Sequence, residues 1–421
     1  MSKTHIIGAG MAGLSAAVEL TKLGHKVCLY EAAPQAGGRC RSFYDNKLDC
    51  EIDNGNHLLL SGNTSAMNYL KTIGAEDELI GPDAAIFPFF DVNCQKRWDI
   101  EFNNSRIPFW LLSKSARVPE ASFGQHLTLA KILGAKDHHV IADFIDTDNP
   151  LYERLIDPLS VAVINMPPET ASAKLMANVL KETVMKGGRA CRPRIAKHSL
   201  AKTFVDPAIN YLTSQSVHIT YGARLKSVTH ENERVKVLNF INNQINVDNH
   251  DTVIMALSPE PTGEVLDFIT APKDYSSIVN AHFRLNAPIK TDWAAPLIGL
   301  IGSTSQWVFI RGNIASITIS AGDAYLGIKA DDLTKTLWAE IAPLLGQDAH
   351  KIPPSRIIKE KRATLAQNPA LEPLRPKSVT PYRNLFLAGD WTNTALPATI
   401  EGAIRSGVTA AKHVSCEPVC S

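Results

Sequence analysis

The start of the chain joins short apolar runs to an amphipathic segment through glycine. Thr4 to Ile7 form a β-prone run that ends at Gly8. The next segment carries apolar residues at the intervals of one helix face, namely Leu14, Ala17, Val18 and Leu20. Gly24 fits a helix C-cap, and Lys26 to Tyr30 have the composition of a second strand. The pattern predicts a strand, a helix and a second strand.

The end of the chain repeats part of this order. Leu385 to Ala388 are apolar and stop at the pair Gly389–Asp390. Pro397 follows, and a segment of small residues then opens with helical spacing. A strand, a glycine, an acidic residue and a helix start together form a place for a phosphate-bearing ligand, because the free N–H groups of a helix N-terminus attract anions.

The first turn has the spacing Gly8-x-Gly10-x-x-Gly13. The first glycine permits a tight turn, the second lets the backbone approach a pyrophosphate, and the third lets helix and strand pack closely. Glu31 closes the second strand at the distance where a carboxylate accepts ribose hydroxyls. Its negative charge disfavours a 2′-phosphate. Since the glycines stand between strand and helix with the acid in place, an ordinary glycine-rich turn is the weaker interpretation.

Composition narrows the function classes. The chain has 421 residues, 45% hydrophobic and 20% charged, with a net charge of +1. This suits two or three globular domains, and without a basic block no nucleic-acid partner is expected. The seven cysteines form no CxxC pair, so reduced thiols and no metal site are expected. Without a signal-peptide pattern or an apolar run of about 20 residues, we expect a cytoplasmic protein, peripheral at most on the inner face of a membrane.

The predicted fold class is α/β, with a discontinuous Rossmann-like domain and a mixed α+β second domain. Residues 217–259 contain two or more predicted strands and include the apolar run Val253 to Leu257. The first domain is expected from residues 1–80, 190–258 and 350–421. The second is expected from residues 81–189 and 259–349. Neither segment of the second domain has another strand-GxGxxG-helix unit, so electrons must come from a substrate, a diffusing reductant such as NAD(P)H, or a redox protein.

The second domain carries apolar clusters. Phe87 to Phe90 and Ile107 to Leu112 are the most prominent, and residues 171–185 have helical spacing, with Leu175, Val179, Leu180 and Val184 on one face. Most of these residues are expected in the core. For Phe109–Leu112 we expect an apolar pocket or a membrane-dipping surface, because tryptophan suits an interface.

The nucleotide motif continues beyond Glu31 into Gly37-Gly38-Arg39, with Arg41-Ser42 behind it. This extension resembles the GR2-type FAD fingerprint of amine oxidases and carotenoid-type desaturases. In that superfamily the Gly-Gly-Arg loop lies along the FAD diphosphate and ribityl chain. A C-terminal Gly-Asp or Gly-Glu pair contacts the same region, and the next helix points its N-terminus at the flavin ring.

Longer phrases are similar to one family. They are GGRCRSFYD, LDCEIDNGNHLLLSGN, PLSVAVINMPPETASA and GDWTNTALPATIEGAIRSG. Together they resemble hydroxysqualene dehydroxylases, the squalene-associated FAD-dependent desaturases of hopanoid biosynthesis. The resemblance implies FAD as cofactor and a long-chain isoprenoid, hydroxysqualene, as substrate. It implies reduction to squalene with loss of water, a peripheral membrane contact and other squalene-pathway enzymes as partners.

The resemblance also assigns site residues. His57 is the candidate proton donor, with a structural role in hydrogen bonding as the equal alternative, and Asp53, Asp157 and Glu401 are further candidate acids. Leu225 is placed beside the adenine. The residues expected to bind FAD are Gly8, Gly10, Met11, Ala12, Gly13, Glu31, Ala32, Gly38, Arg39, Asn54, Gly55, Asn56, Leu225, Gly389, Asp390, Thr399 and Ile400.

Other functions remain open at this point. A carotenoid-type desaturase would run the flavin oxidatively. An amine oxidase often places aromatic side chains from the C-terminal segment beside the ring, but Trp391 is the single aromatic in Trp391–Thr394. A non-catalytic FAD-containing lipid-binding or assembly protein is the third alternative.

Overall fold

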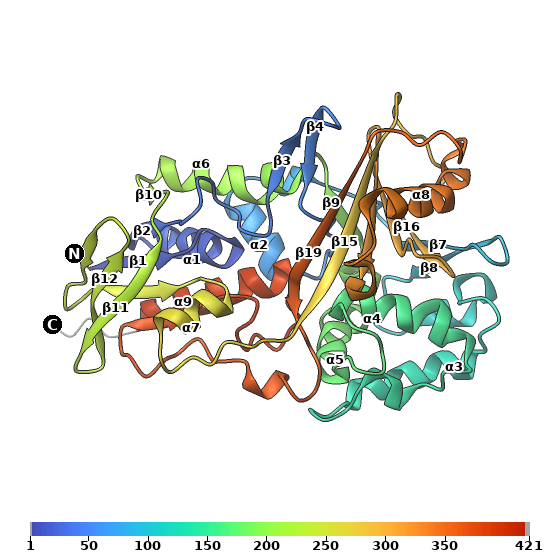
Figure 1. The fold of residues 1–421 in the computed structure, drawn as a ribbon. Coiled ribbons are helices and arrows are strands. Elements are labelled where there is room, and N and C mark those ends of the chain that lie inside the picture. The colour runs from blue at the N-terminus through green and yellow to red at the C-terminus, as the bar shows by residue number, and fades with distance from the viewer. Residues whose placement is uncertain (1, 417–421) are drawn as a thin grey trace.

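The computed structural model describes residues 2–416 and contains two principal sheets (Figure 1). The first is parallel, has five strands in the order β10-β2-β1-β14-β20, and lies at the left of Figure 1. Its strands are β10 (His218–Thr220), β2 (Lys26–Tyr30), β1 (Lys3–Ile7), β14 (Thr252–Met255) and β20 (Leu385–Leu387). The sheet therefore joins three distant parts of the sequence.

Side-chain alternation places this sheet between two layers. Ile6, Ile254 and Phe386 face one cluster, which includes residues from α1 (Met11–Lys22), α2 (Thr64–Thr72), α6 (Asp206–Ser214) and α9 (Ile400–Cys416). Their neighbours Ile7, Met255 and Leu387 face the small sheet of β11 (Leu225–Glu231), β12 (Arg234–Phe240) and β13 (Gln244–Asn246). Both faces are buried at β14 and β20, which explains why these two strands are almost entirely apolar.

The helices α1 and α9 come from opposite ends of the chain and pack closely. The Ser15 hydroxyl donates to the Ile404 carbonyl at 3.0 Å. A Cβ atom added at Gly407 would overlap the Ala12 carbonyl oxygen. A small residue at this crossing lets the two helix backbones approach, and this fixes the start of α9 relative to the start of α1.

The second sheet has seven strands in the order β19-β15-β18-β17-β16-β7-β8, and only β16 and β7 are parallel neighbours. The bounds are β19 (Ser355–Leu365), β15 (Tyr275–Arg284), β18 (Ile314–Ser320), β17 (Trp307–Arg311), β16 (Leu297–Ile301), β7 (Ala85–Asp91) and β8 (Lys96–Phe102). One face packs on α8 (Ala330–Ile341). Figure 1 shows β15 and β19 running from this sheet toward the parallel sheet.

The remaining elements cover or connect these sheets. A helical layer below the second sheet in Figure 1 contains α3 (Phe123–Thr128), α4 (Asp157–Ile164) and α5 (Ala173–Glu182). The helix α7 (Pro259–Val265) follows β14. Short strands complete the fold: β3 (Ser42–Asp45) pairs with β4 (Cys50–Asp53), and β9 (Pro193–Ala196) pairs with β5 (Leu59–Leu60) and β6 (Leu79–Ile80).

Two expectations differ from the observed fold. The strand β19 pairs with β15, so residues 355–365 join the second sheet although we assigned 350–421 to the first domain. The helix predicted over residues 171–185 ends at Glu182, and Val184 lies in a following 3₁₀ turn. In both cases a long-range contact or a local change of helix type decides the boundary, and neither is visible in apolar spacing. Among residues 2–416, no helix is long and apolar enough to cross a bilayer.

Candidate functional site

The glycine turn, residues Gly8 to Gly13, lies at the carboxyl end of β1. Gly8 has φ +103° and donates its N–H to the Tyr30 carbonyl at 2.7 Å. A Cβ added at Gly13 would overlap the Gly8 carbonyl oxygen, whereas one added at Gly10 would meet no heavy atom within 4 Å. Gly13 is therefore needed for the fold of the turn itself. Gly10 leaves its outer side open, as the approach of a pyrophosphate requires.

The Glu31 carboxylate lies beside this turn and bridges it to the segment after β2. Its carboxylate accepts hydrogen bonds from the N–H groups of Ala9, at 2.7 Å, and Ala33, at 2.8 Å. The backbone of Glu31 also accepts from Ala223 N–H at 2.8 Å. Ala32 and the segment before Leu225 thus lie beside the turn, although the Leu225 side chain itself is buried in the core beneath the sheet.

The Gly-Gly-Arg loop lies directly against the glycine turn. Gly37 N–H donates to the Ala9 carbonyl at 2.8 Å, and a Cβ at Gly38 would stand 3.3 Å from the Gly10 Cα. Arg39 extends to the other end of the chain, where its Nη2 lies 2.6 Å from both carboxylate oxygens of Asp390. The Asp390 charge raises the pKa of Arg39. One ion pair therefore joins the two motifs that the sequence analysis placed in one site.

The segment after β20 turns sharply into α9. A Cβ at Gly389 would overlap the Trp391 indole, which lies beneath it and donates to the Leu257 carbonyl at 2.9 Å. Trp391 is buried within the core. Thr399 accepts from Gly402 N–H at 3.1 Å and so caps the first turn of α9, which begins at Ile400. The one aromatic of Trp391–Thr394 is consequently a core residue and does not flank the site.

Residues 54–57 lie against one face of the second sheet. Asn56 Nδ2 donates to Thr318 Oγ1 at 3.1 Å, and Thr318 donates to Asn280 Oδ1 at 2.9 Å. Asn280 donates back to the Asn54 carbonyl at 3.4 Å, and the Asn54 amide reaches Glu360 at 3.3 Å. A Cβ at Gly55 would stand 3.2 Å from the Asn280 amide nitrogen. The loop is therefore held by the polar side chains of β15, β18 and β19.

The same face changes from polar to aromatic along one row. Strand pairing aligns Asn280 with Thr318, Thr318 with Trp307, Trp307 with Gly299, Gly299 with Phe89 and Phe89 with Trp98. Directly paired residues share a face. Phe89 stacks on Trp98 with ring centroids 5.7 Å apart and meets Trp307 edge-on at 5.5 Å. A Cβ at Gly299 would crowd the Phe89 ring at 2.7 Å.

His57 occupies the junction of the polar and aromatic parts. Its neighbour Asn56 contacts Thr318, and its other neighbour Leu58 packs against the aromatic cluster. Burial lowers the pKa of His57 to about 4, which the Asp53 carboxylate opposes and the Arg39 charge assists. The imidazole is therefore neutral near pH 7 in the free protein. Within residues 2–416 its ring has no hydrogen-bond partner.

The other candidate acids are engaged elsewhere. Asp53 pairs with Arg311 at 2.6 Å and accepts from the Leu200 N–H at 2.9 Å. Glu401 accepts from the N–H groups of Ser65 and Ala66, at 3.1 and 2.8 Å, and so caps α2. Asp157 lies in the first turn of α4, and burial raises its pKa. Asp53 and Glu401 thus have structural contacts that account for their burial.

Several residues of this site escaped the sequence analysis: Asn280, Thr318, Glu360, Trp307 and Trp98. A signal was present in β15, where Asn280 and His282 alternate with Val279, Ala281 and Phe283. Polar residues alternating inside a buried strand indicate a second face that meets polar groups. The pairing that unites them with residues 54–57 is long-range and could not be predicted from spacing.

The side chains of the cluster Phe109–Leu112 are divided between the core and the surface. Trp110 is half-buried, with its ring edge-on to Phe102 at 5.1 Å and to His126 at 5.9 Å, and Leu111 is buried. Phe109 and Leu112 are the exposed residues, at 54% and 70%. The tryptophan that suggested an interface packs inward, because residues i and i+3 of a 3₁₀ turn share a side, and in this segment that exposed side carries Phe109 and Leu112.

Comparison with known proteins gives consistent results. Residues 11–415 match the family of flavin-containing amine oxidoreductases. A hydroxysqualene dehydroxylase of Rhodopseudomonas palustris is 43% identical over 98% of this chain and 99% of its own length. One of Zymomonas mobilis is 42% identical over 98% of each. The solved structure of a Methanosarcina mazei oxidoreductase superposes with a TM-score of 0.73, at 13% identity, over 97% of this chain and all of its own.

The residues present fit FAD. The turn leaves an open side at Gly10, the Glu31 carboxylate lies beside the turn where a ribose was predicted, and the Arg39–Asp390 ion pair joins the Gly-Gly-Arg loop to the segment before α9.

Proposed function

Because the chain belongs to the hydroxysqualene dehydroxylase family of flavin-containing amine oxidoreductases, and is thus an FAD-dependent oxidoreductase, we propose that it reduces hydroxysqualene to squalene. The carbon–oxygen bond of the allylic alcohol breaks and a carbon–hydrogen bond forms. One proton leaves with the hydroxyl as water, and one hydride adds to carbon. The observation that carries this proposal is the full-length identity to relatives bearing that name.

We propose that the predicted residues hold the cofactor, which when bound in its reduced form supplies the hydride. The glycine turn with Met11 and Ala12 would face the diphosphate, and Glu31, Ala32 and the backbone at Leu225 would face the adenosine. Gly38, Arg39, Gly389 and Asp390 contact the central chain. Asn54, Gly55, Asn56, Thr399 and Ile400 surround the ring. The hydrogen bonds that fix Glu31, Arg39 and Asn56 support this arrangement, because each polar group is already held in place before the cofactor binds.

For the proton we propose His57. With a pKa of about 4, its charged form is a much stronger acid than an ordinary imidazolium, which suits a weakly basic alcohol oxygen. The same shift makes the charged form scarce, about one molecule in a thousand at pH 7. If His57 protonates the hydroxyl, kcat/KM should therefore rise about tenfold for each unit that the pH falls between 8 and 5. A His57→Gln variant should lose both the rate and this slope.

The substrate is proposed to lie along the row from Asn280 to Trp98. The amide and hydroxyl groups at one end suit an alcohol, and the aromatic rings at the other suit an isoprenoid chain. The buried position of Trp391 counts against an amine oxidase that uses this segment for an aromatic pair. No observation favours a desaturase or a non-catalytic protein over the dehydroxylase.

We also propose a membrane-facing surface, the apolar patch, at the exposed side of the helical layer. It comprises Ile107, Phe109, Leu112, Phe123, Leu127 and Met185. The segments are contiguous, since Trp110 packs against His126 of α3 and Gly188 N–H donates to the Asn103 carbonyl at 2.8 Å. Exposed Arg106, Lys114 and Lys186 stand among them, which favours a bilayer with anionic headgroups.

Flotation with anionic liposomes tests this surface. The double variant Phe109→Asp and Leu112→Asp should abolish co-flotation, while Leu23→Asp, at an exposed leucine at the end of α1, should leave it unchanged. Equal flotation of all three proteins would contradict a role of the apolar patch.

The reductant is proposed to be external, either NAD(P)H or a redox protein.

A substrate panel tests the proposed reaction against its alternatives. Reduced protein would be mixed anaerobically with hydroxysqualene. Oxidised protein would be mixed with a long-chain isoprenoid polyene that still has single bonds to dehydrogenate, or with alkyl amines. We expect flavin reoxidation with squalene formation in the first mixture and no flavin reduction in the others. Reduction of the oxidised flavin by a polyene or an amine, with no turnover of hydroxysqualene, would replace the proposal by the corresponding alternative.

A further inference from the structure

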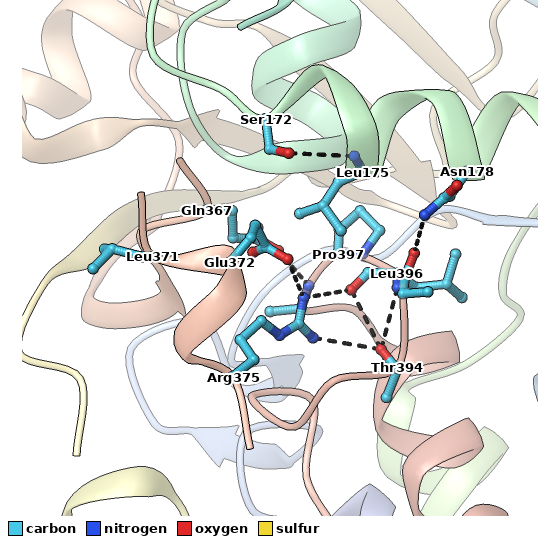
Figure 2. A network of polar contacts seen from close by, with 12 residues as sticks. Ser172, Leu175, Asn178, Gln367, Leu371, Glu372, Arg375, Thr394, Leu396 and Pro397 are labelled. Carbon is cyan, nitrogen blue, oxygen red and sulfur yellow. Dashed lines mark hydrogen bonds and ion pairs between the residues drawn. The ribbon is translucent and has the colours of Figure 1, made fainter. Parts of the chain in front are cut away.

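A buried arginine, Arg375, donates hydrogen bonds to several carbonyl groups of residues 390–396, the segment that links Asp390 to α9. Arg375 is 7% exposed and follows a short 3₁₀ turn at Glu372–Leu374. Its Nη2 donates to the carbonyls of Asp390 and Thr392, both at 2.7 Å, and its Nη1 donates to the Leu396 carbonyl at 2.9 Å. Figure 2 shows the guanidinium between Glu372, Thr394 and Leu396.

The charge of this guanidinium is balanced by one carboxylate. Glu372 lies 3.0 Å from Arg375 Nη1. Burial raises the pKa of Glu372, and the arginine opposes that shift. A buried ion pair needs further hydrogen bonds to offset its desolvation, and here they come from backbone carbonyls of residues 390–396. The pair is thus satisfied only when this segment has its observed conformation.

The same segment is held from the helical layer. Asn178 of α5 donates its amide to the Ala395 carbonyl at 2.9 Å, a contact drawn in Figure 2. Ala395 has φ +60°, a conformation that a non-glycine residue adopts only when its surroundings fix it. Gln367 accepts from Ala398 N–H at 2.6 Å and donates to the Ile164 carbonyl of α4 at 2.6 Å. Residues 390–398 therefore depend on contacts from two directions.

We propose that Arg375 is a positioning residue for the cofactor. By holding the Asp390 carbonyl and the Leu396 carbonyl with one planar group, it fixes where the Asp390 carboxylate meets Arg39 and where α9 begins. A lysine cannot replace it, because three donors on one nitrogen cannot reach acceptors spread over this arc. The inference rests on the proposed placement of FAD beside Asp390 and is independent of the substrate.

The test uses Arg375→Lys and the matched control Arg383→Gln. Arg383 forms an exposed pair with Glu233 at 3.1 Å and should be replaceable. In apo-protein titrated with FAD, we expect Arg375→Lys to raise the Kd at least tenfold and the control to stay within twofold. Amide hydrogen exchange in Arg375→Lys apo-protein should accelerate within residues 390–398 and remain unchanged in α1 and β1.

A second variant covers the case in which Arg375→Lys does not fold. Asn178→Ala removes one surface contact to the same segment and should raise the FAD Kd in the same direction by about threefold, because one neutral hydrogen bond is lost. An unchanged Kd and unchanged exchange over residues 390–398 in either folded variant would overturn the proposal. Accelerated exchange throughout the protein with normal FAD affinity would assign Arg375 to general stability and also overturn it.

Discussion

The glycine turn and the polar-to-aromatic row of the second sheet build their sites in different ways. The turn is made by backbone atoms that lie close together in the sequence, and Gly13 is required by its contact with the Gly8 carbonyl oxygen of the same stretch. The row is made by side chains from β7, β8, β15, β17 and β18, which meet only through strand pairing. A cofactor shared by a whole superfamily can be bound by the first kind of site. Recognition of a particular substrate depends on the second kind of site, in which single side chains can be replaced without loss of the strand pairing.

The largest expected effect separates two functions within the glycine turn. Gly13→Ala forces a Cβ onto the Gly8 carbonyl oxygen and should cost about 3 kcal/mol of folding stability, which lowers the melting temperature by several degrees. Gly10→Ala meets no protein atom and should fold with nearly the original melting temperature but fail to retain FAD. Thermal unfolding of the apo-proteins and flavin content after purification measure the two effects. Equal melting temperatures of the two variants would contradict the assignment of a folding role to Gly13 and a cofactor-binding role to Gly10.

The next effect belongs to the second sheet and concerns acid stability. Burial lowers the pKa of His282 from 6.5 to about 4, with Arg311 assisting and Asp53 and Asp45 opposing. Below pH 6.5 the unfolded chain takes up a proton that the folded chain does not, so folding stability falls as the pH drops toward 4. The full loss from this group is about 3 kcal/mol.

His282→Gln tests that loss, because its amide can keep the 2.8 Å contact with Ser316 Oγ. Urea unfolding at pH 7 and pH 4.5 should show a smaller difference in this variant than in the original protein. His250→Gln, at an exposed histidine, serves as the control. A pH dependence identical in all three proteins would contradict the assignment to His282.

Glu31 gives an intermediate effect on cofactor binding. Replacing its carboxylate by an amide, Glu31→Gln, weakens the charge-assisted bonds to Ala9 and Ala33 N–H and to the proposed ribose, by about 2 kcal/mol in total. The FAD Kd should rise about thirtyfold, with kcat unchanged at saturating FAD. Fluorescence titration measures the Kd, and a Kd within twofold of the original would place the ribose elsewhere.

The smallest expected effect concerns Thr318, in the row from Asn280 to Trp98, and tests whether this row serves the substrate or the cofactor. Thr318→Val keeps the shape of the side chain but removes the hydroxyl between Asn56 and Asn280. A loss of about 1 kcal/mol is expected in kcat/KM for the isoprenoid alcohol. A smaller loss of FAD affinity is expected, because Asn56 keeps its contact with the Ile317 carbonyl at 3.5 Å. Thr318→Ser should restore most of the activity. If the FAD Kd changed as much as kcat/KM, the row would belong to the cofactor site.

The parts of this molecule that could be predicted from sequence are those whose physics is local. The strand–turn–helix of residues 3–22 and the acid at Glu31 follow from residue types at fixed spacing. That Arg39 and Asp390 lie in one site was implied only by the family resemblance, and their ion pair was not predicted. The sheet membership of β19, the end of α5 at Glu182 and the inward orientation of Trp110 depend on contacts with distant residues. His57 illustrates the limit, because its lowered pKa comes from burial that spacing does not reveal.

The central claim is that the hydride and the proton reach hydroxysqualene in one turnover of reduced enzyme. The most direct measurement is an anaerobic single turnover in D₂O, with the holoprotein photoreduced before hydroxysqualene is added. Flavin absorbance is followed while the products are extracted for mass spectrometry. The transferable hydrogen of a reduced flavin exchanges with solvent, so it becomes deuterium in D₂O, whereas the proton donated to the hydroxyl leaves with water. The account therefore predicts flavin reoxidation and stoichiometric squalene carrying one deuterium at the carbon that bore the hydroxyl. Flavin that stays reduced beside unchanged hydroxysqualene would contradict it.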